Sequence, residues 1–166
     1  GAGKTSLVRA SGLTLPFDGD GAVEAPSARF NISDQALLIE FSGRLTASEE
    51  PQARQLWLEA LQHIRGLRSR QPVNGIVVAV SVDELLAMLP EQAAAYAAAI
   101  RQRLDEAVQR LRANAPVYIV VTKLDRVVGF EEIFEDLTTE ERAAAFGIPI
   151  APDLGGDARG PAEALD

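Results

Sequence analysis

Two unbroken runs of apolar, mostly β-branched residues constrain the fold of this chain more than any other feature. They span Gly75–Val82 (GIVVAVSV) and Val117–Val121 (VYIVV). Strands that are apolar at every position are covered on both faces, as in parallel sheets. An amphipathic helix is predicted between them, over Glu91–Asn114, and Pro116 prevents its continuation. A strand, a helix and a strand in this order predict a layered α/β fold with a mainly parallel sheet.

The other segments continue this alternation. Further elements are predicted as a short strand at Ala36–Phe41, a helix with an apolar stripe over Ala53–Ile64, and two short helices near Phe130–Asp136 and Thr139–Phe146. Residues 11–35 are rich in Gly, Ser, Asp and Pro, which predicts mostly loop. Residues 1–150 form one predicted domain, and residues 151–166, rich in Gly, Pro, Ala and Asp, a loop or linker.

The charge balance limits the classes of partner. The chain has 166 residues, which suits one domain, and a formal net charge of -8. An acidic chain lacks the basic stripe that nucleic acid or an anionic membrane requires, so no nucleic-acid partner is expected. The absence of cysteine excludes disulfides and thiolate metal sites. The chain has no signal peptide and no apolar run near the ~20 residues of a membrane span. It opens inside a motif, which suggests a fragment, so membrane contact is expected only through segments outside this chain.

The first residues match the second half of a phosphate-binding loop. Gly3, Lys4 and Thr5 fit the end of G-x-x-x-x-G-K-[ST], in which glycines let backbone N–H groups approach phosphate oxygens. Lys4 is expected to reach the β and γ phosphates, and Thr5 to hold Mg²⁺ through its hydroxyl. The predicted nucleotide-binding residues here are Gly1, Ala2, Gly3, Lys4, Thr5 and Ser6. The motif predicts a three-layer P-loop NTPase fold of the GTPase type, with its first strand missing from this chain.

A base-reading motif follows the strand at Val117–Val121. Ligands of parallel sheets bind at the carboxyl ends of the strands, and Thr122, Lys123 and Asp125 stand there as [NT]-K-x-D. An aspartate accepts two hydrogen bonds from guanine, at the ring N–H and the exocyclic amine, and adenine offers no such pair. A buried carboxylate left unpaired costs about 1–3 kcal/mol or more, so Asp125 favours guanine over adenine.

A switch-like segment follows the strand at Ala36–Phe41. Glu40 and Gly43 stand where GTPases carry D-x-x-G, with Glu in place of the Asp that contacts Mg²⁺ through water. Gly43 is expected to offer its N–H to the γ-phosphate. Arg44 replaces the Gln that orients the attacking water in Ras-like proteins, so it either stabilises transition-state charge or makes a surface salt bridge. Ser33 either contributes a hydroxyl to Mg²⁺ or caps a turn.

Longer blocks around these motifs resemble one family. The blocks are GAGKTSLVRASGL, FNISDQALLIEFSGRL, PVNGIVVAVSVDELL and PVYIVVTKLDRVVGFEEIFEDLTTEERAAAFG, and they cover roughly residues 1–150. The chain resembles the cytoplasmic GTPase-like domain of the IcmF/TssM family, an inner-membrane component of bacterial type VI secretion systems. The resemblance implies a domain on the cytoplasmic side of the inner membrane that works with other secretion components. It implies phosphate, metal and base-reading roles for Lys4, Thr5, Glu40, Thr122, Lys123 and Asp125.

Two functions are compatible with these motifs. One is a nucleotide switch that binds GTP or GDP with Mg²⁺ and hydrolyses GTP weakly. The other is a pseudo-GTPase scaffold that docks other secretion components without turnover. Glu40 and Arg44 favour the scaffold, whereas the phosphate and base-reading motifs favour the switch, and Asp125 argues against an ATPase.

Other polar residues carry weaker signals. His63 is the only histidine, and with no cysteine or second histidine to complete a metal site it is predicted to be structural or exposed. Acidic residues from Glu131 to Glu141 form either a solvated face or a docking surface for a basic partner.

Overall fold

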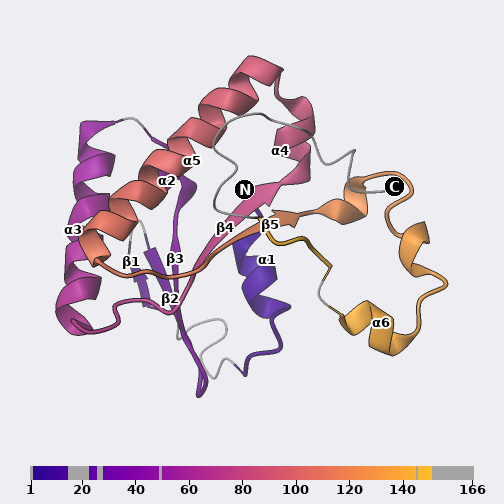
Figure 1. Cartoon of the computed structure of the whole chain (residues 1–166), viewed down its shortest axis with the longest axis horizontal. Helices are drawn as coiled ribbons and strands as arrows, with labels where there is room; N and C mark the ends of the chain where they lie inside the picture. Colours follow the sequence, from indigo (N-terminus) through magenta and orange to yellow (C-terminus); the bar gives the residue numbers. More distant parts are fainter. Residues whose placement is uncertain (1, 15–22, 26–27, 49, 145, 151–166) are drawn as a thin grey trace. The chain divides into compact units, whose positions relative to one another are not determined.

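The computed structural model describes residues 2–14, 23–25, 28–48, 50–144 and 146–150. The chain divides into two compact units at Phe130 and Glu131. In the first unit the elements are α1 (Lys4–Arg9), β1 (Val23–Ala25), β2 (Ala28–Ile32), β3 (Leu37–Phe41), α2 (Gly43–Ala47), α3 (Pro51–Leu67), β4 (Ile76–Ser81), α4 (Val82–Ala87), α5 (Pro90–Leu111), β5 (Val117–Thr122) and the 3-10 turn η1 (Leu124–Arg126) (Figure 1). The second unit contains the 3-10 turn η2 (Glu132–Phe134) and α6 (Thr139–Ala143).

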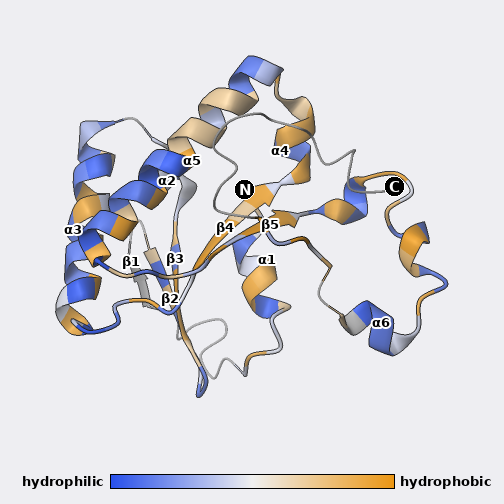
Figure 2. Ribbon diagram, in the orientation of Figure 1, coloured by the Kyte–Doolittle hydropathy of each residue, from blue (hydrophilic) through white to orange (hydrophobic). Residues whose placement is uncertain are grey.

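The strand–helix–strand unit predicted from the two apolar runs is present. β4 and β5 pair in parallel, from Ile76 opposite Val117 to Ser81 opposite Thr122. The helices α4 and α5 connect them, and α5 ends at Leu111, before Pro116. Figure 2 shows β4 and β5 as hydrophobic, whereas α3 and α5 carry both hydrophilic and hydrophobic residues. The prediction of a parallel pair is therefore confirmed.

The other described sheet is antiparallel, with strand order β1–β2–β3. The prediction of a mainly parallel sheet is therefore wrong for these strands, and the segment 11–35, predicted as mostly loop, contains the strands β1 and β2. A tight turn at residues 33–36 joins β2 to β3, and such a short connection permits only antiparallel pairing. The sequence of β2 alternates Ala28, Phe30 and Ile32 with polar residues, the period-2 pattern of a hairpin strand. The described chain is thus a mixed α/β structure with one parallel pair.

The core of the first unit lies between α2, α3 and α5, and α3 and α5 lie side by side (Figure 1). Its buried members are Leu45, Trp57, Leu61, Ala107 and Leu111. Phe41, at the end of β3, meets Trp57 edge to face with ring centroids 5.1 Å apart. Trp57 is only 7% exposed, so it anchors this core.

The second unit contains the two short helices expected there, both shorter than predicted. Thr138 caps α6 in a reciprocal box: its hydroxyl accepts from the Glu141 N–H, and the Glu141 carboxylate accepts from the Thr138 N–H. Phe134 and Phe146 pack edge to face, with centroids 5.7 Å apart. The acidic side chains of this region are exposed. No helix in the described parts of the chain is long and apolar enough to cross a bilayer.

Leu61 tests the core assignment. Its side chain is 2% exposed, so Leu61→Ala is expected to lower the free energy of unfolding by about 2–5 kcal/mol through lost burial and a cavity. Leu67→Ala, at the end of the same helix, removes the same atoms from a residue that is 85% exposed and should cost less than about 0.5 kcal/mol. Urea denaturation measures both variants, and equal costs would contradict the assignment.

Candidate functional site

The segments predicted as phosphate loop and base-reading motif lie side by side. The Thr122 hydroxyl, at the end of β5, donates to the Ala2 carbonyl at 2.9 Å and to the Val80 carbonyl at 3.2 Å. The first contact joins residues 120 positions apart. It places the carboxyl end of the parallel pair against the start of α1, where ligands of α/β sheets bind.

Gly3 makes this close approach possible. It precedes α1 with φ +69°, a left-handed conformation that glycine adopts without steric cost. A Cβ at Gly3 would lie 3.4 Å from both Cβ and Oγ1 of Thr122. The backbone conformation therefore favours glycine at this position, and a Cβ there would make a close contact with Thr122.

The second part of the site joins α1 to β3. Glu40 accepts a hydrogen bond from the Thr5 hydroxyl, Oγ1 to Oε2, at 3.3 Å. Its other carboxylate oxygen, Oε1, accepts from the Asn31 amide nitrogen on β2 at 2.8 Å. The structure thus brings together the motif threonine and the switch acid, and it adds Asn31, which the sequence analysis missed.

The oxygen atoms of Thr5 and Glu40 fit a magnesium ion that is shared with phosphates. Mg²⁺ prefers hard oxygen ligands and is commonly held by one or two protein groups, with phosphates and water completing its octahedron. No group of three or more His, Cys, Asp or Glu residues in the described ranges could hold a metal by itself. Thr5 and Glu40 could thus supply two oxygen ligands to a metal whose other ligands come from elsewhere.

The base-reading loop is braced by an acid that the sequence analysis missed. Asp83, at the start of α4, accepts from Lys123 Nζ at 3.3 Å and from Arg126 Nη1 at 2.9 Å through the same oxygen, Oδ2. Lys123 itself has φ +61°, which turns the chain into η1. Asp125, within η1, is exposed. A sequence signal for Asp83 existed, because it directly follows an apolar strand at the edge where site residues are expected.

One buried hydroxyl at this edge has no partner. Ser81 is 0% exposed and lies opposite Thr122 in the β4–β5 ladder. Its Oγ makes no hydrogen bond with any described residue. Buried polar groups are nearly always paired, and Ser81 is an exception among the described residues.

Ser33 lies apart from the Thr5–Glu40 pair. Its hydroxyl donates to the Ala36 carbonyl and accepts from the N–H groups of Gln35 and Ala36, in the turn between β2 and β3. The turn lies beyond the Ile32–Leu37 pair, and Glu40 lies three strand residues further along β3, which is on the order of 10 Å. Of its two sequence interpretations, the contacts fit the turn cap, and the structure does not bring Ser33 to Thr5 and Glu40.

The other predicted residues lie around the start of α1 and α2. Lys4 is half-buried and Ser6 is exposed. Gly43 and Arg44 form the exposed first turn of α2. Gly1 lies outside the described residues.

The segment that follows Gly43 is anchored to the core. Leu45 is 3% exposed and packs in the cluster with Trp57 and Leu61. Arg103 of α5 donates to two backbone carbonyls of this segment, from Nε to Thr46 at 3.3 Å and from Nη2 to Ser48 at 2.7 Å. Both an apolar and a polar attachment therefore fix this segment against the helices.

Glu106 holds Arg103 in place. It accepts from Arg103 Nη1 at 2.9 Å and from Arg54 Nε of α3 at 2.8 Å. Burial alone would raise the pKa of Glu106, but the hydrogen bonds and charges of Arg54 and Arg103 outweigh it and hold that pKa below its ordinary value. This triad links α3, α5 and the segment after Gly43.

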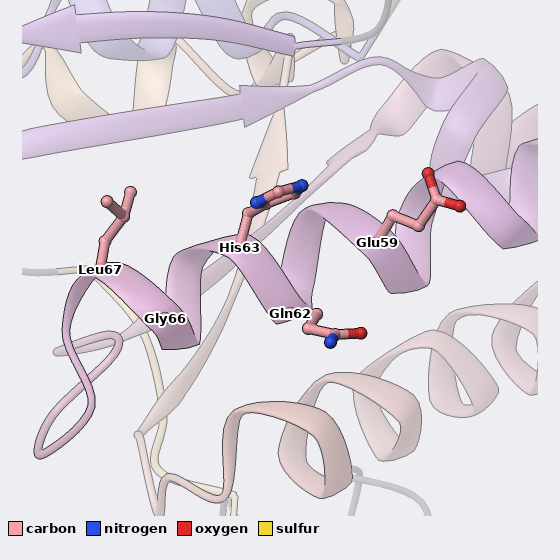
Figure 3. Close-up of a pocket in the computed structure, with 5 residues that line it drawn as sticks. All are labelled: Glu59, Gln62, His63, Gly66 and Leu67. Carbon is pink, nitrogen blue, oxygen red and sulfur yellow. The ribbon is translucent and has the colours of Figure 1, made fainter.

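A surface pocket on α3 is lined by Glu59, Gln62, His63, Gly66 and Leu67 (Figure 3). His63 is exposed, in line with one of the two alternatives predicted for it. In Figure 3, His63 and Leu67 point to one side of the helix and Gln62 to the other. None of these residues belongs to the phosphate, switch or base-reading motifs.

Comparison with known proteins decides the family. Residues 50–162 match the IcmF-related N-terminal domain. The chain belongs to the IcmF-related N-terminal domain family. The matched region includes Asp83 and the base-reading motif, whereas the phosphate loop and Glu40 precede it.

A curated relative extends the likeness of this IcmF-related domain over the whole chain. The chain is similar to "Type VI secretion system component TssM1" of Pseudomonas aeruginosa, with 35% identity over 175 aligned positions. The alignment covers 100% of this chain but only 16% of the relative. No solved structure matches the chain.

The triad around Glu106 predicts an acid-dependent loss of stability. Because the folded-state pKa of Glu106 is lowered, its stabilising effect is complete above its ordinary value of 4.5 and is lost as the pH falls below it. Glu106→Gln is expected to lower the free energy of unfolding at pH 7 by about 1.5–3 kcal/mol and to flatten its decline below pH 4.5. Urea denaturation at several pH values measures both effects.

Asp105→Asn is the matched control. Asp105 neighbours Glu106 on α5, but its ion pair with Arg101 is exposed, with 54% of the Asp105 side chain accessible. Such pairs contribute about 0–1 kcal/mol, so this variant should keep the acid-dependent decline of the parent. An equal response of the two variants would contradict the role given to Glu106.

Proposed function

We propose that this chain is a guanine-nucleotide-binding, P-loop GTPase-like domain. The observation that carries the proposal is the hydrogen bond from Thr122 to the Ala2 carbonyl, which joins a phosphate-loop sequence to a base-reading sequence. A chance match of either motif alone would not require the two to meet at one edge of a parallel pair. Asp125 selects guanine, because its carboxylate complements two adjacent N–H groups.

The arrangement of the strands supports a P-loop sheet. In that fold the strand that leads into the phosphate loop lies in the middle of the sheet. Among the described strands, β3 and β4 each have a partner on one side only, β2 and β5 respectively. We infer that a further strand between β3 and β4 would complete a three-layer fold of this kind.

The site residues divide the work of binding. Lys4 and the backbone around Gly3 hold the phosphates, and the Gly43 N–H lies at the start of α2, where a γ-phosphate would be sensed. Thr5 and Glu40 would hold Mg²⁺, which supplies charge neutralisation between the phosphate oxygens. Thr122 holds the loop in register, and Lys123 lies along the base. These residues support nucleotide binding more strongly than GTP hydrolysis, because Arg44 replaces the Gln that orients the attacking water.

The biological setting is proposed from the family and the relative. A relative named as a type VI secretion component is similar over the whole chain. We therefore place this domain in a subunit of a type VI secretion membrane complex, on the cytoplasmic side of the bacterial inner membrane. Its partners are guanine nucleotide and other secretion components.

A second function, a pseudo-GTPase scaffold, is favoured by the anchored segment after Gly43. Nucleotide switches work by ordering and releasing this segment when the γ-phosphate is bound or lost. Here Leu45 is buried and Arg103 holds the carbonyls of Thr46 and Ser48. A segment tied in this way suits a constant docking surface.

Titrating nucleotides into the full-length protein tests the proposed function. GTP and GDP with Mg²⁺ are expected to bind more tightly than ATP, and Lys4→Ala to weaken binding. Asp125→Asn is expected to shift the preference from guanine to xanthine nucleotides by about 10- to 100-fold, because an amide can donate to the xanthine 2-carbonyl. Asp34→Asn, in the exposed β2–β3 turn, should leave the preference unchanged. If neither GTP nor GDP binds, the proposal is wrong.

Amide hydrogen exchange separates the switch from the scaffold. In the scaffold, protection of residues 43–48 is expected to be the same with GDP and with a non-hydrolysable GTP analogue. Arg103→Ala should lower that protection in both states, because it removes the bonds to Thr46 and Ser48. Protection that changes with the γ-phosphate in the parent protein would favour the switch.

A further inference from the structure

The most unusual residue of the proposed metal site is Glu40, which stands where the GTPase pattern has aspartate. The extra methylene gives this carboxylate more rotamers, and a metal ligand works best when its orientation is fixed. In this chain a neighbour on β2 fixes it: Asn31 donates to Glu40 Oε1 at 2.8 Å. We propose that Asn31 is a positioning residue that orients Glu40 for Mg²⁺, an inference that rests on the proposed nucleotide site.

The hairpin register explains why a glutamate is required. Arg29 lies opposite Glu40, and Asn31 lies opposite Leu38, so Asn31 is a diagonal neighbour of Glu40 on the same face. Diagonal neighbours in an antiparallel pair are about 7–8 Å apart, within reach of a long side chain. Asn31 has a short side chain, so the length must come from the residue at position 40. An aspartate there would fall one methylene short of Asn31.

The two carboxylate oxygens of Glu40 then have different roles. Oε1 is occupied by the Asn31 amide, while Oε2 faces the Thr5 hydroxyl at 3.3 Å. The oxygen nearer to the metal-binding hydroxyl is therefore the one that Asn31 leaves available. The amide is neutral, so Asn31 itself adds no positive charge beside the carboxylate.

The position of Asn31 on a strand makes the orientation rigid. Asn31 is held by the ladder with β3, opposite Leu38, and it directly follows Phe30, which is paired on both sides. Asn31 itself is half-buried. Residues that orient metal ligands in this way typically change metal affinity 10- to 100-fold when they are removed.

The inference is tested by titrating Mg²⁺ into the full-length protein in the presence of GDP. Asn31→Ala is expected to raise the Mg²⁺ concentration that gives half-maximal Mg²⁺-dependent binding by about 10- to 100-fold. GDP affinity in excess EDTA should stay at the parent value, because Asn31 acts only through Glu40. Gln35→Ala, exposed in the turn of the same hairpin, is the control and should match the parent in both conditions.

A length exchange gives a second readout. Glu40→Asp is expected to weaken Mg²⁺ dependence, because the shorter carboxylate loses Asn31. Glutamine is one methylene longer than asparagine, so Asn31→Gln compensates for the shorter aspartate at position 40. The double variant should therefore recover most of the magnesium affinity. A role limited to hairpin stability would not produce this recovery.

The outcomes separate the inference from the function on which it rests. If the parent binds no GDP or GTP, the nucleotide site itself is wrong. If the parent shows Mg²⁺-dependent binding that Asn31→Ala leaves unchanged, Asn31 has no positioning role. Loss of binding by Asn31→Ala in EDTA as well as in Mg²⁺, or a double variant no better than Glu40→Asp, would also overturn the inference.

Discussion

The parallel ladder between β4 and β5 is the constraint on which the rest of the site depends. Because parallel strands end at the same edge, the ladder delivers Asp83 after β4 and Lys123 after β5 to one place, where they pair. The same edge carries Thr122, whose hydroxyl reaches across to Ala2. The antiparallel hairpin contributes the remaining acid, Glu40, at the end of β3. Two sheets of different type thus supply one candidate site.

The helices connect this site to the core. Phe41 follows Glu40 directly and packs on Trp57, so the strand that carries the acid is fixed by the apolar cluster. Beyond Gly43 the chain enters the same cluster through Leu45. Arg103 then adds hydrogen bonds that depend on its ion pair with Glu106. The site and the core are therefore parts of one continuous packing arrangement, in which a change at α5 reaches the segment after Gly43.

The sequence predicted the features that depend on local pattern. The apolar runs identified β4 and β5, the 3.6-residue periodicity identified α3 and α5, and the motifs identified Thr5 and Thr122. The hairpin strands β1 and β2 were missed, because short strands within a Gly-, Ser- and Pro-rich segment carry little periodic signal. Asn31 was missed for a different reason, because its role arises from a partner on a neighbouring strand and no spacing along the chain encodes that contact. Asp83 carried a usable signal, since it follows an apolar strand, but its partners Lys123 and Arg126 are known only from the structure.

The bond between Thr122 and Ala2 has a consequence for how the protein is made. The phosphate loop leaves the ribosome first, but the strand that carries its partner follows 120 residues later. Chains are synthesised from the amino end, and early segments can fold before later ones exist. This loop cannot reach its final contacts until β5 has emerged. The first part of the site to be translated is thus among the last to be completed. The contact between Ala2 and Thr122 therefore cannot form on the ribosome before β5 has been synthesised.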